Sequence, residues 1–199
     1  KLGIPIVIAQ ILLISMQFVD TVMAGHVSAR DLAALGIATA LFHPLLLLMV
    51  GVLMAVTPMV AQLKGSQKDD RISKVVADAL QLSLVFALPL ILLLHLLEPL
   101  MEFIGYPEEV SRIGDGYLQA VAWGVPAMLA YDVFRHFNEG VALTRPNMYF
   151  HIVGLMLNIL GNYTLMFGHF GFPAMGAVGA GWSTAPVSYT HLTLPTILS

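Results

Sequence analysis

The sequence predicts an all-α integral membrane protein, and two observations lead to this fold class. Of the 199 residues, 58% are hydrophobic and 11% are charged, whereas about 25% of residues are charged in a typical soluble domain. The apolar residues also come in blocks of about 20 or more, the length that a helix needs to cross a hydrocarbon core about 30 Å thick. We therefore interpret these blocks as membrane spans and not as one large soluble core.

Five apolar blocks follow one another, and each predicts one span. They cover about residues 2–24, 32–63, 75–97, 116–141 and 148–167. The second block contains Pro44 and Pro58, so we expect a long span that is kinked or that extends beyond the bilayer. The third block stops at Glu98 and Pro99, and an acidic loop separates it from the fourth. The members of this loop are Glu102, Glu108, Glu109, Arg112 and Asp115.

A sixth span starts near Pro173, but after Ala185 the chain is too polar and too broken by proline to complete a crossing. We therefore predict five to six transmembrane helices in one unit over residues 1–185, with the sixth helix incomplete. Residues 186–199 form a separate tail whose sequence resembles a translated sequencing adapter, and we exclude it from fold reasoning. Because position 1 is not Met and no signal peptide follows, we expect the chain to begin inside a longer reading frame.

The distribution of Lys and Arg predicts the orientation, because short loops rich in these residues stay in the cytoplasm. With the N-terminus inside, only Arg30 and Arg112 lie on the outer side. The cytoplasmic side then receives Lys1, Lys64, Lys68, Arg71, Lys74 and Arg145. The sequence thus predicts a multi-pass membrane protein with its N-terminus inside.

Asp20 is the first ionisable residue at membrane depth. An ionisable side chain there costs at least about 2.5 to 3.5 kcal/mol, so it needs a partner or a function. A carboxylate in low dielectric favours its protonated form, which suits a proton carrier, and its oxygens also suit Na⁺. The alternative is that Asp20 lies at the outer interface or caps the span.

Asn158 and Asn162 lie four residues apart in the fifth block, and therefore on one helix face. Counted from the cytoplasmic side, they share a depth with Asp20. Amide oxygens beside a carboxylate form a hydrogen-bonded site for a proton or for Na⁺. The alternative is that each asparagine only joins helices together, which is a common role of Asn in membranes.

Asp132 and Arg135 lie three residues apart in the fourth block and are predicted to form an ion pair. We favour a structural role for this pair, closing the inner face between helices.

Other classes of function lack support in the sequence. A net charge of −3 and the lack of a basic stripe argue against a nucleic-acid partner. The chain has no cysteine, and its histidines do not have the spacing of a helical zinc site. We therefore predict no metal and no cofactor apart from a coupling ion. A membrane enzyme would need a nucleophile, base or metal converging at one depth, and we find none.

Several motifs resemble one family. They are VDTVMAG at residues 19–25, TPMVAQLKG at 57–65, Glu139-Gly140 followed by Arg145-Pro146, LNILGNY at 157–163, and the stretch 168–185. With these motifs the chain resembles the N-terminal lobe of multidrug and toxic compound extrusion (MATE) transporters of the NorM-like bacterial branch. The resemblance implies a twelve-helix fold of two six-helix lobes that exports organic cations, dyes and drugs in exchange for H⁺ or Na⁺.

The resemblance also implies roles and partners. The cavity carboxylate of the family falls on Asp20, and the accompanying amides fall on Asn158 and Asn162. The expected partners are cationic drugs or dyes, membrane lipid and the C-terminal lobe, which this chain lacks. Two alternatives remain: a lipid-linked oligosaccharide flippase of the same superfamily, which would carry more Arg and Lys in its cavity, and an inactive truncated fragment.

Overall fold

The computed structural model describes residues 3–185, and within this range the fold is entirely helical. The helices are α1 (Gly3–Val27), α2 (Ala29–Leu53), α3 (Val56–Gly65), α4 (Ile72–Leu94), α5 (Leu97–Ile104), α6 (Glu108–Ala122), α7 (Val125–Gly140) and α8 (Arg145–Leu165), with a 3-10 turn η1 (Asp69–Arg71) before α4. A further helix covers residues 177–185. The predicted fold class is confirmed.

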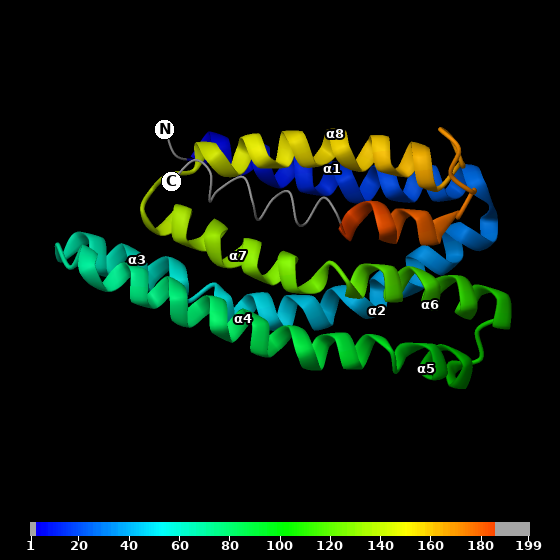
Figure 1. The fold of residues 1–199 in the computed structure, drawn as a ribbon, viewed down its shortest axis with the longest axis horizontal. Helices are drawn as coiled ribbons and strands as arrows, with labels where there is room; N and C mark the ends of the chain where they lie inside the picture. Colours follow the sequence, from blue (N-terminus) through cyan, green and yellow to red (C-terminus); the bar gives the residue numbers. More distant parts are fainter. Residues whose placement is uncertain (1–2, 186–199) are drawn as a thin grey trace.

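The helices run along the long axis of the molecule in two groups (Figure 1). One group contains α1, α8 and the helix of residues 177–185, and the other contains α2 to α7. Within and between these groups, α1 packs on α8 and α2, α2 on α6, and α7 on α3 and α4. This arrangement sets α1 beside α8 over most of their length.

Three helical segments are long and apolar enough to cross a membrane, as judged by length and composition. They are residues 3–27, 29–65 and 69–104, and they correspond to the first three predicted spans. The fourth and fifth predicted spans fall on α6–α7 and on α8, which carry more polar residues and lie alongside the other three in the bundle (Figure 1).

Proline explains three breaks in the helices: one within residues 29–65, one within residues 69–104 and one between α6 and α7. Pro58, Pro99 and Pro126 each occupy the second or third position of a helix, and the two residues before that helix form a turn. A proline ring removes one N–H donor and clashes with the carbonyl group four residues earlier, so the preceding helix ends there. The breaks lie at residues 54–55, 95–96 and 123–124.

The prediction of an acidic loop between the third and fourth spans is wrong. Helix α5 continues past Pro99 to Ile104, α6 begins at Glu108, and the connection is only residues 105–107. Gly105 ends α5 in the left-handed region, with φ of 94°, as glycine does at many helix ends. Apolar counting missed the first half of α6, residues 108–115, because polar residues there face inward: Ser111 and Asp115 are buried.

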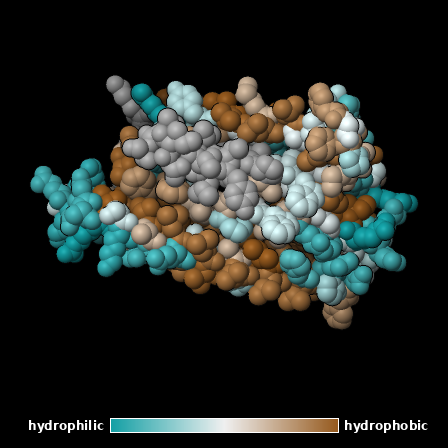
Figure 2. Space-filling model, in the orientation of Figure 1, coloured by the Kyte–Doolittle hydropathy of each residue, from teal (hydrophilic) through white to brown (hydrophobic). Residues whose placement is uncertain are grey.

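The face of the molecule shown in Figure 2 is apolar over much of its middle and polar at both ends. Figure 2 shows brown side chains over the body of the bundle and teal side chains at the α3–α4 tip and near the α5–α6 turn. Large apolar side chains such as Leu47, Leu88 and Leu92 are each 68% exposed. Such an exposed apolar surface exceeds what a soluble monomer shows, so it is the surface that faces lipid. The protein is a multi-pass membrane protein.

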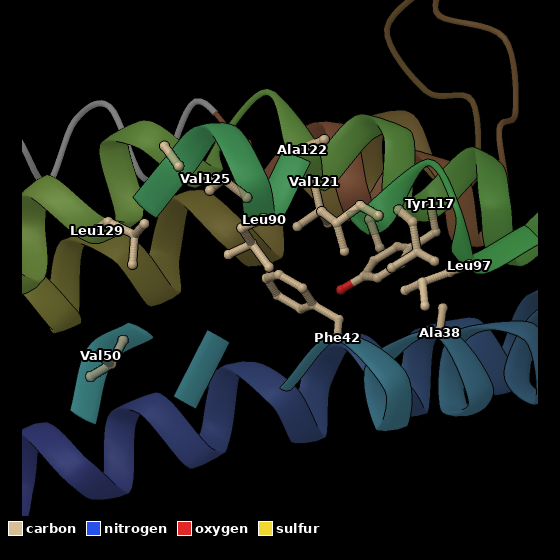
Figure 3. Packing of buried hydrophobic residues seen from close by; sticks show 14 of the residues in the cluster. Ala38, Phe42, Val50, Leu90, Leu97, Tyr117, Val121, Ala122, Val125 and Leu129 are labelled. Carbon is tan, nitrogen blue, oxygen red and sulfur yellow. The ribbon is translucent and has the colours of Figure 1, made fainter. Parts of the chain in front are cut away.

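The core between α2, α4 and α6 is packed from aliphatic and aromatic side chains. Phe42 of α2, Leu90 of α4 and Val121 of α6 are buried and lie near one another (Figure 3). The predicted tail of residues 186–199, and the question of whether the sixth helix is incomplete, lie outside the described residues.

Candidate functional site

Asp20 of α1 lies against α8, where two asparagines reach its carboxylate. Asn158 Nδ2 donates a hydrogen bond of 3.0 Å to Asp20 Oδ1, and Asn162 Nδ2 donates one of 2.5 Å to the same oxygen. Both asparagines are fully buried. The structure thus brings together the three residues that the sequence analysis placed at one depth.

The composition of α8 explains why these amides point inward. Its outer face is apolar, with Met156 and Leu160 exposed, while Asn158 and Asn162 lie on the buried face four residues apart. A membrane helix presents its apolar side to lipid and turns its polar residues towards other helices. Because α1 and α8 begin at the same end of the bundle (Figure 1), the asparagines meet Asp20 at a matching depth.

Ser183 also belongs to this site, and the sequence analysis did not identify it. Its Oγ lies within hydrogen-bond distance of Asn162 Oδ1 and is 2.9 Å from the carbonyl oxygen of Ala180, so its single proton can go to either acceptor. Ser183 is only 4% exposed. The sequence analysis interpreted the segment that carries it as the start of an incomplete sixth span, and no spacing rule links a serine there to Asn162.

Glycine makes the approach of this last helix possible. A Cβ atom added at Gly161 would lie 2.7 Å from Cβ of Ser183, which is closer than two carbon atoms can approach. Gly161 therefore allows the helix of residues 177–185 to pack against α8 at the level of Asn162. Small residues serve this purpose at many helix contacts in membranes.

One buried oxygen of the site has no partner. Asn158 donates through Nδ2, but its Oδ1 is fully buried and accepts no hydrogen bond from the described residues. A buried acceptor without a partner loses about 1 to 3 kcal/mol of solvation. Together with the carboxylate of Asp20, this oxygen offers two acceptors that a cation or a donor group can satisfy.

Asp132 and Arg135 form an ion pair on α7. Arg135 Nη2 lies 2.9 Å from Asp132 Oδ1, and Arg135 Nε donates to the same oxygen at 3.0 Å. The two side chains are 17% and 23% exposed, respectively. The pair is separate from the Asp20 site, and it lies on α7, which leads into α8 (Figure 1).

A network of polar contacts surrounds this pair, and we call it the α7 network. It joins α7 to α8 through Asn147, which accepts from Asn138 at 3.1 Å and donates to the carbonyl oxygen of Arg135 at 3.4 Å. It joins α7 to α3 through His136, whose carbonyl oxygen accepts from Thr57 at 3.1 Å. A cavity of about 40 Å³ adjoins the network, which is room enough for a water molecule.

Within residues 3–185, no cluster of three or more His, Cys, Asp and Glu side chains is arranged as a metal site. The Asp20 site differs from the α7 network because it combines a carboxylate with an unpaired oxygen.

A helical membrane lobe in which a partly buried carboxylate meets buried amides resembles one half of a transporter built from two repeats. The MatE family profile matches residues 5–164. The chain belongs to the MatE family, which confirms the resemblance stated from the motifs.

Relatives with assigned names agree with this membership. The chain is 43% identical over 186 residues to the multidrug resistance protein NorM of Photobacterium profundum, a match that covers 94% of the chain and 41% of that protein. It is 40% identical over 194 residues to NorM of Vibrio cholerae, covering 98% of the chain and 42% of that protein. The chain thus spans about two fifths of the length of these relatives and corresponds to their N-terminal lobe.

Solved structures show the same fold. An outward-facing multidrug resistance MATE transporter of the MOP superfamily matches with a TM-score of 0.86 at 19% identity, over 97% of this chain and 42% of that one. A MOP superfamily transporter from Pyrococcus furiosus, whose binding pocket has reversed polarity and suggests a different function, matches equally well, with the same TM-score, identity and coverage. At this identity the likeness establishes the fold and leaves the substrate open.

Proposed function

We propose that this chain is the N-terminal lobe of a transporter that exports organic cations and drugs in exchange for H⁺ or Na⁺, with Asp20 as the coupling carboxylate. The observation that carries the proposal is the contact of Asp20 with two buried amides at membrane depth. The multidrug resistance names of the relatives support the kind of substrate. Because the chain spans two fifths of these relatives, the activity requires a second lobe as partner.

The chemistry of exchange follows from the single negative charge. An ionised Asp20 carboxylate in a low-dielectric lobe attracts either a cationic drug or a coupling ion. When a proton or Na⁺ binds, the site becomes neutral, the drug loses its electrostatic partner, and the packing of α1 against α8 adjusts. The ion then shifts the lobe towards the state that releases the drug outward, because it binds that state more tightly.

Three residues supply ligands for Na⁺ in this proposal. Asp20 provides carboxylate oxygens, and Asn158 provides its unpaired Oδ1. Asn162 provides its Oδ1, which lies within hydrogen-bond distance of Ser183 Oγ in this structure. All are hard oxygen donors, the kind that small cations of the main groups prefer. For H⁺, Asp20 itself is the acceptor and the amides orient its carboxylate.

We place the protein in a bacterial inner membrane with its N-terminus inside. The α3–α4 tip carries Lys64, Lys68, Arg71 and Lys74 and lies at the end of the bundle where α1 begins, whereas Glu108, Glu109 and Arg112 lie on α6 at the other end (Figure 1). The end with more Lys and Arg is expected to face the cytoplasm.

The decisive experiment measures energised efflux of ethidium from proteoliposomes. The protein is a two-lobe transporter in which residues 1–185 precede the second lobe of the Photobacterium profundum relative, hereafter the two-lobe protein. We compare it with its Asp20→Asn variant and with Asp78→Asn, which removes an exposed carboxylate from α4. Efflux driven by a proton or sodium gradient should be lost with Asp20→Asn and kept with Asp78→Asn, at equal amounts of reconstituted protein.

Two outcomes would contradict the proposal. If Asp20→Asn exports ethidium as well as the unsubstituted protein, Asp20 does not couple. If the unsubstituted two-lobe protein moves no cation under either gradient while the intact relative does, this lobe does not serve drug export. A flippase of the same superfamily then becomes the better assignment, even though Arg135 is paired with Asp132 and so is poorly placed to bind a pyrophosphate.

A further inference from the structure

Asp31, at the start of α2, connects two helix ends through one carboxylate. Its Oδ1 accepts a hydrogen bond of 2.7 Å from the backbone N–H of Ala177, and its Oδ2 accepts one of 2.6 Å from Ser28 Oγ. Ser28 in turn caps α2, because its Oγ accepts from the N–H of Asp31 at 3.0 Å. The carboxylate therefore caps the helix of residues 177–185 while it is itself held by the cap of α2.

The turn before this helix fits closely around Asp31. Gly176 has φ of 58°, and a Cβ atom at this position would collide with the Asp31 carboxylate. The same turn is hydrogen-bonded to the end of α8, because the N–H of Met175 donates to the carbonyl oxygen of Leu165 at 2.9 Å. The first residue of the helix is thus fixed from two sides, by α2 and by α8.

Close packing transmits this fixed position along the helix. A Cβ atom at Gly179 would lie 2.7 Å from the backbone of Leu165, and one at Gly181 would lie 2.7 Å from the carbonyl oxygen of Tyr117. The helix therefore has little freedom to slide between α6 and α8. Ser183 follows Ala177 by six residues, roughly 9 Å along a helix, so the position of the cap sets the depth of Ser183.

We propose that Asp31 is a positioning residue for the Asp20 site. By capping the helix of residues 177–185, it sets the register at which Ser183 meets Asn162, and Asn162 in turn donates to Asp20. The inference rests on the proposed role of Asp20 in cation coupling. It assigns a function at the site to a carboxylate at the outer end of the bundle that touches neither drug nor ion.

The charge of Asp31 suits this role. A carboxylate at a helix N-terminus is stabilised by the helix dipole and by the unpaired N–H groups there. The neighbouring Arg30 does not neutralise it, because Arg30 is engaged with Glu109 of α6 at 2.5 Å. Glu109 therefore offers a matched control, since it is an acidic residue at the same end that contacts another helix but not residues 177–185.

The test uses the two-lobe protein and its Asp31→Ala, Asp31→Asn and Glu109→Ala variants. We measure the Na⁺ or H⁺ concentration that gives half-maximal ethidium efflux, and separately the KM for ethidium. Asp31→Ala should raise the half-maximal ion concentration roughly three- to tenfold, the range expected for loss of one helix cap, with the KM for ethidium unchanged. In Asp31→Asn the half-maximal ion concentration should stay within about twofold of that of the unsubstituted protein, since Asn caps a helix as well as Asp does. Glu109→Ala should leave this concentration unchanged.

An unchanged ion dependence in Asp31→Ala, or an equal change in Glu109→Ala, would overturn the proposal. Hydrogen exchange of residues 177–185 gives a second readout that does not depend on transport. Asp31→Ala should accelerate this exchange, and Gly176→Ala should do the same by displacing the carboxylate; unchanged exchange in both variants counts against the cap. If the unsubstituted protein exports no ethidium, the proposed function fails, and hydrogen exchange still decides whether Asp31 fixes the helix.

Discussion

Two carboxylates of this lobe, Asp20 on α1 and Asp132 on α7, have surroundings that differ in one respect. Asp132 has its own cation, Arg135, three residues further along the same helix. Asp20 meets the neutral amides of Asn158 and Asn162, and among residues 3–185 no Lys, Arg or His forms an ion pair with it. A carboxylate with a fixed cation is already neutralised, whereas one with only amide partners has to obtain its positive charge from outside.

This difference separates a structural from an exchangeable charge. The Asp132–Arg135 pair and the rest of the α7 network join α3, α7 and α8, which favours the structural role that we predicted for the pair. The Asp20 site holds an unpaired oxygen and one uncompensated charge, which favours the binding of H⁺ or Na⁺. Four predictions test the comparison, from the largest expected effect to the smallest.

The largest effect is expected from Asp132→Asn. This substitution leaves Arg135 charged and largely buried without its partner, so the two-lobe protein should lose about 3 to 5 kcal/mol of unfolding free energy. Asp20→Asn should lose less than about 1 kcal/mol, because an amide oxygen can still accept from both asparagines. Thermal unfolding in detergent measures both values, and the double variant Asp132→Asn with Arg135→Gln should recover most of the loss. Equal losses for the two single variants would remove the distinction between the two carboxylates.

Gly161→Ala tests the packing that brings Ser183 to the Asp20 site. The new Cβ atom meets Ser183, so we expect a loss of about 1 to 3 kcal/mol from overpacking, together with weaker ion dependence of ethidium efflux. Gly36→Ala is the control, because no atom lies within 4 Å of a Cβ atom at that position. Similar effects of both substitutions would indicate that helix propensity, and not contact with Ser183, is responsible.

Asn158→Ala removes the unpaired oxygen from the Asp20 site. If this oxygen binds Na⁺, the Na⁺ concentration for half-maximal efflux should rise roughly five- to tenfold, as for the loss of one ordinary hydrogen bond with a net contribution of about 1 to 1.5 kcal/mol. Asn147→Ala, which removes a buried asparagine of the α7 network from the same helix, should lower stability and leave this concentration unchanged. If Asn147→Ala raises the Na⁺ concentration for half-maximal efflux and Asn158→Ala does not, the sodium site lies in the α7 network and not at Asp20.

The smallest effect is expected from Lys64→Ala. Lys64 and Asp69 form an ion pair at 2.7 Å, but both side chains are more than half exposed, so the pair should contribute less than about 1 kcal/mol. Thermal unfolding at low and high salt measures this contribution. A loss as large as that of Asp132→Asn would show that burial is not what makes the Asp132–Arg135 pair important.

Much of the Asp20 site could be predicted from the sequence because its residues lie on helices. Counting along two spans that start on the same side places Asp20 and the two asparagines at one depth, and a spacing of four residues places Asn158 and Asn162 on one face. Ser183 could not be predicted in this way. Its contact with Asn162 depends on how closely the last helix approaches α8, which is set by the glycines between them.

The breaks in the long spans were predicted only in part. Pro44 and Pro58 indicated a kinked second span, yet α2 continues through Pro44 and ends before Pro58. A proline disturbs the turn before it, but whether the helix bends or stops depends on its neighbours. The prediction of an acidic loop was wrong because the first half of α6 turns its polar residues towards other helices. Such a segment has no continuous apolar block, so counting apolar residues does not detect it.

The sequence by itself determined that this protein is helical, spans the membrane and carries a carboxylate, Asp20, within its first span. These properties depend on composition and on local periodicity, which act over one or two turns of helix. Only the tertiary structure decided that Ser183 joins Asn162 and that Asp31 caps the helix of residues 177–185. Those contacts join residues 21 and 146 positions apart, and their distances depend on how the helices pack, which no local pattern specifies.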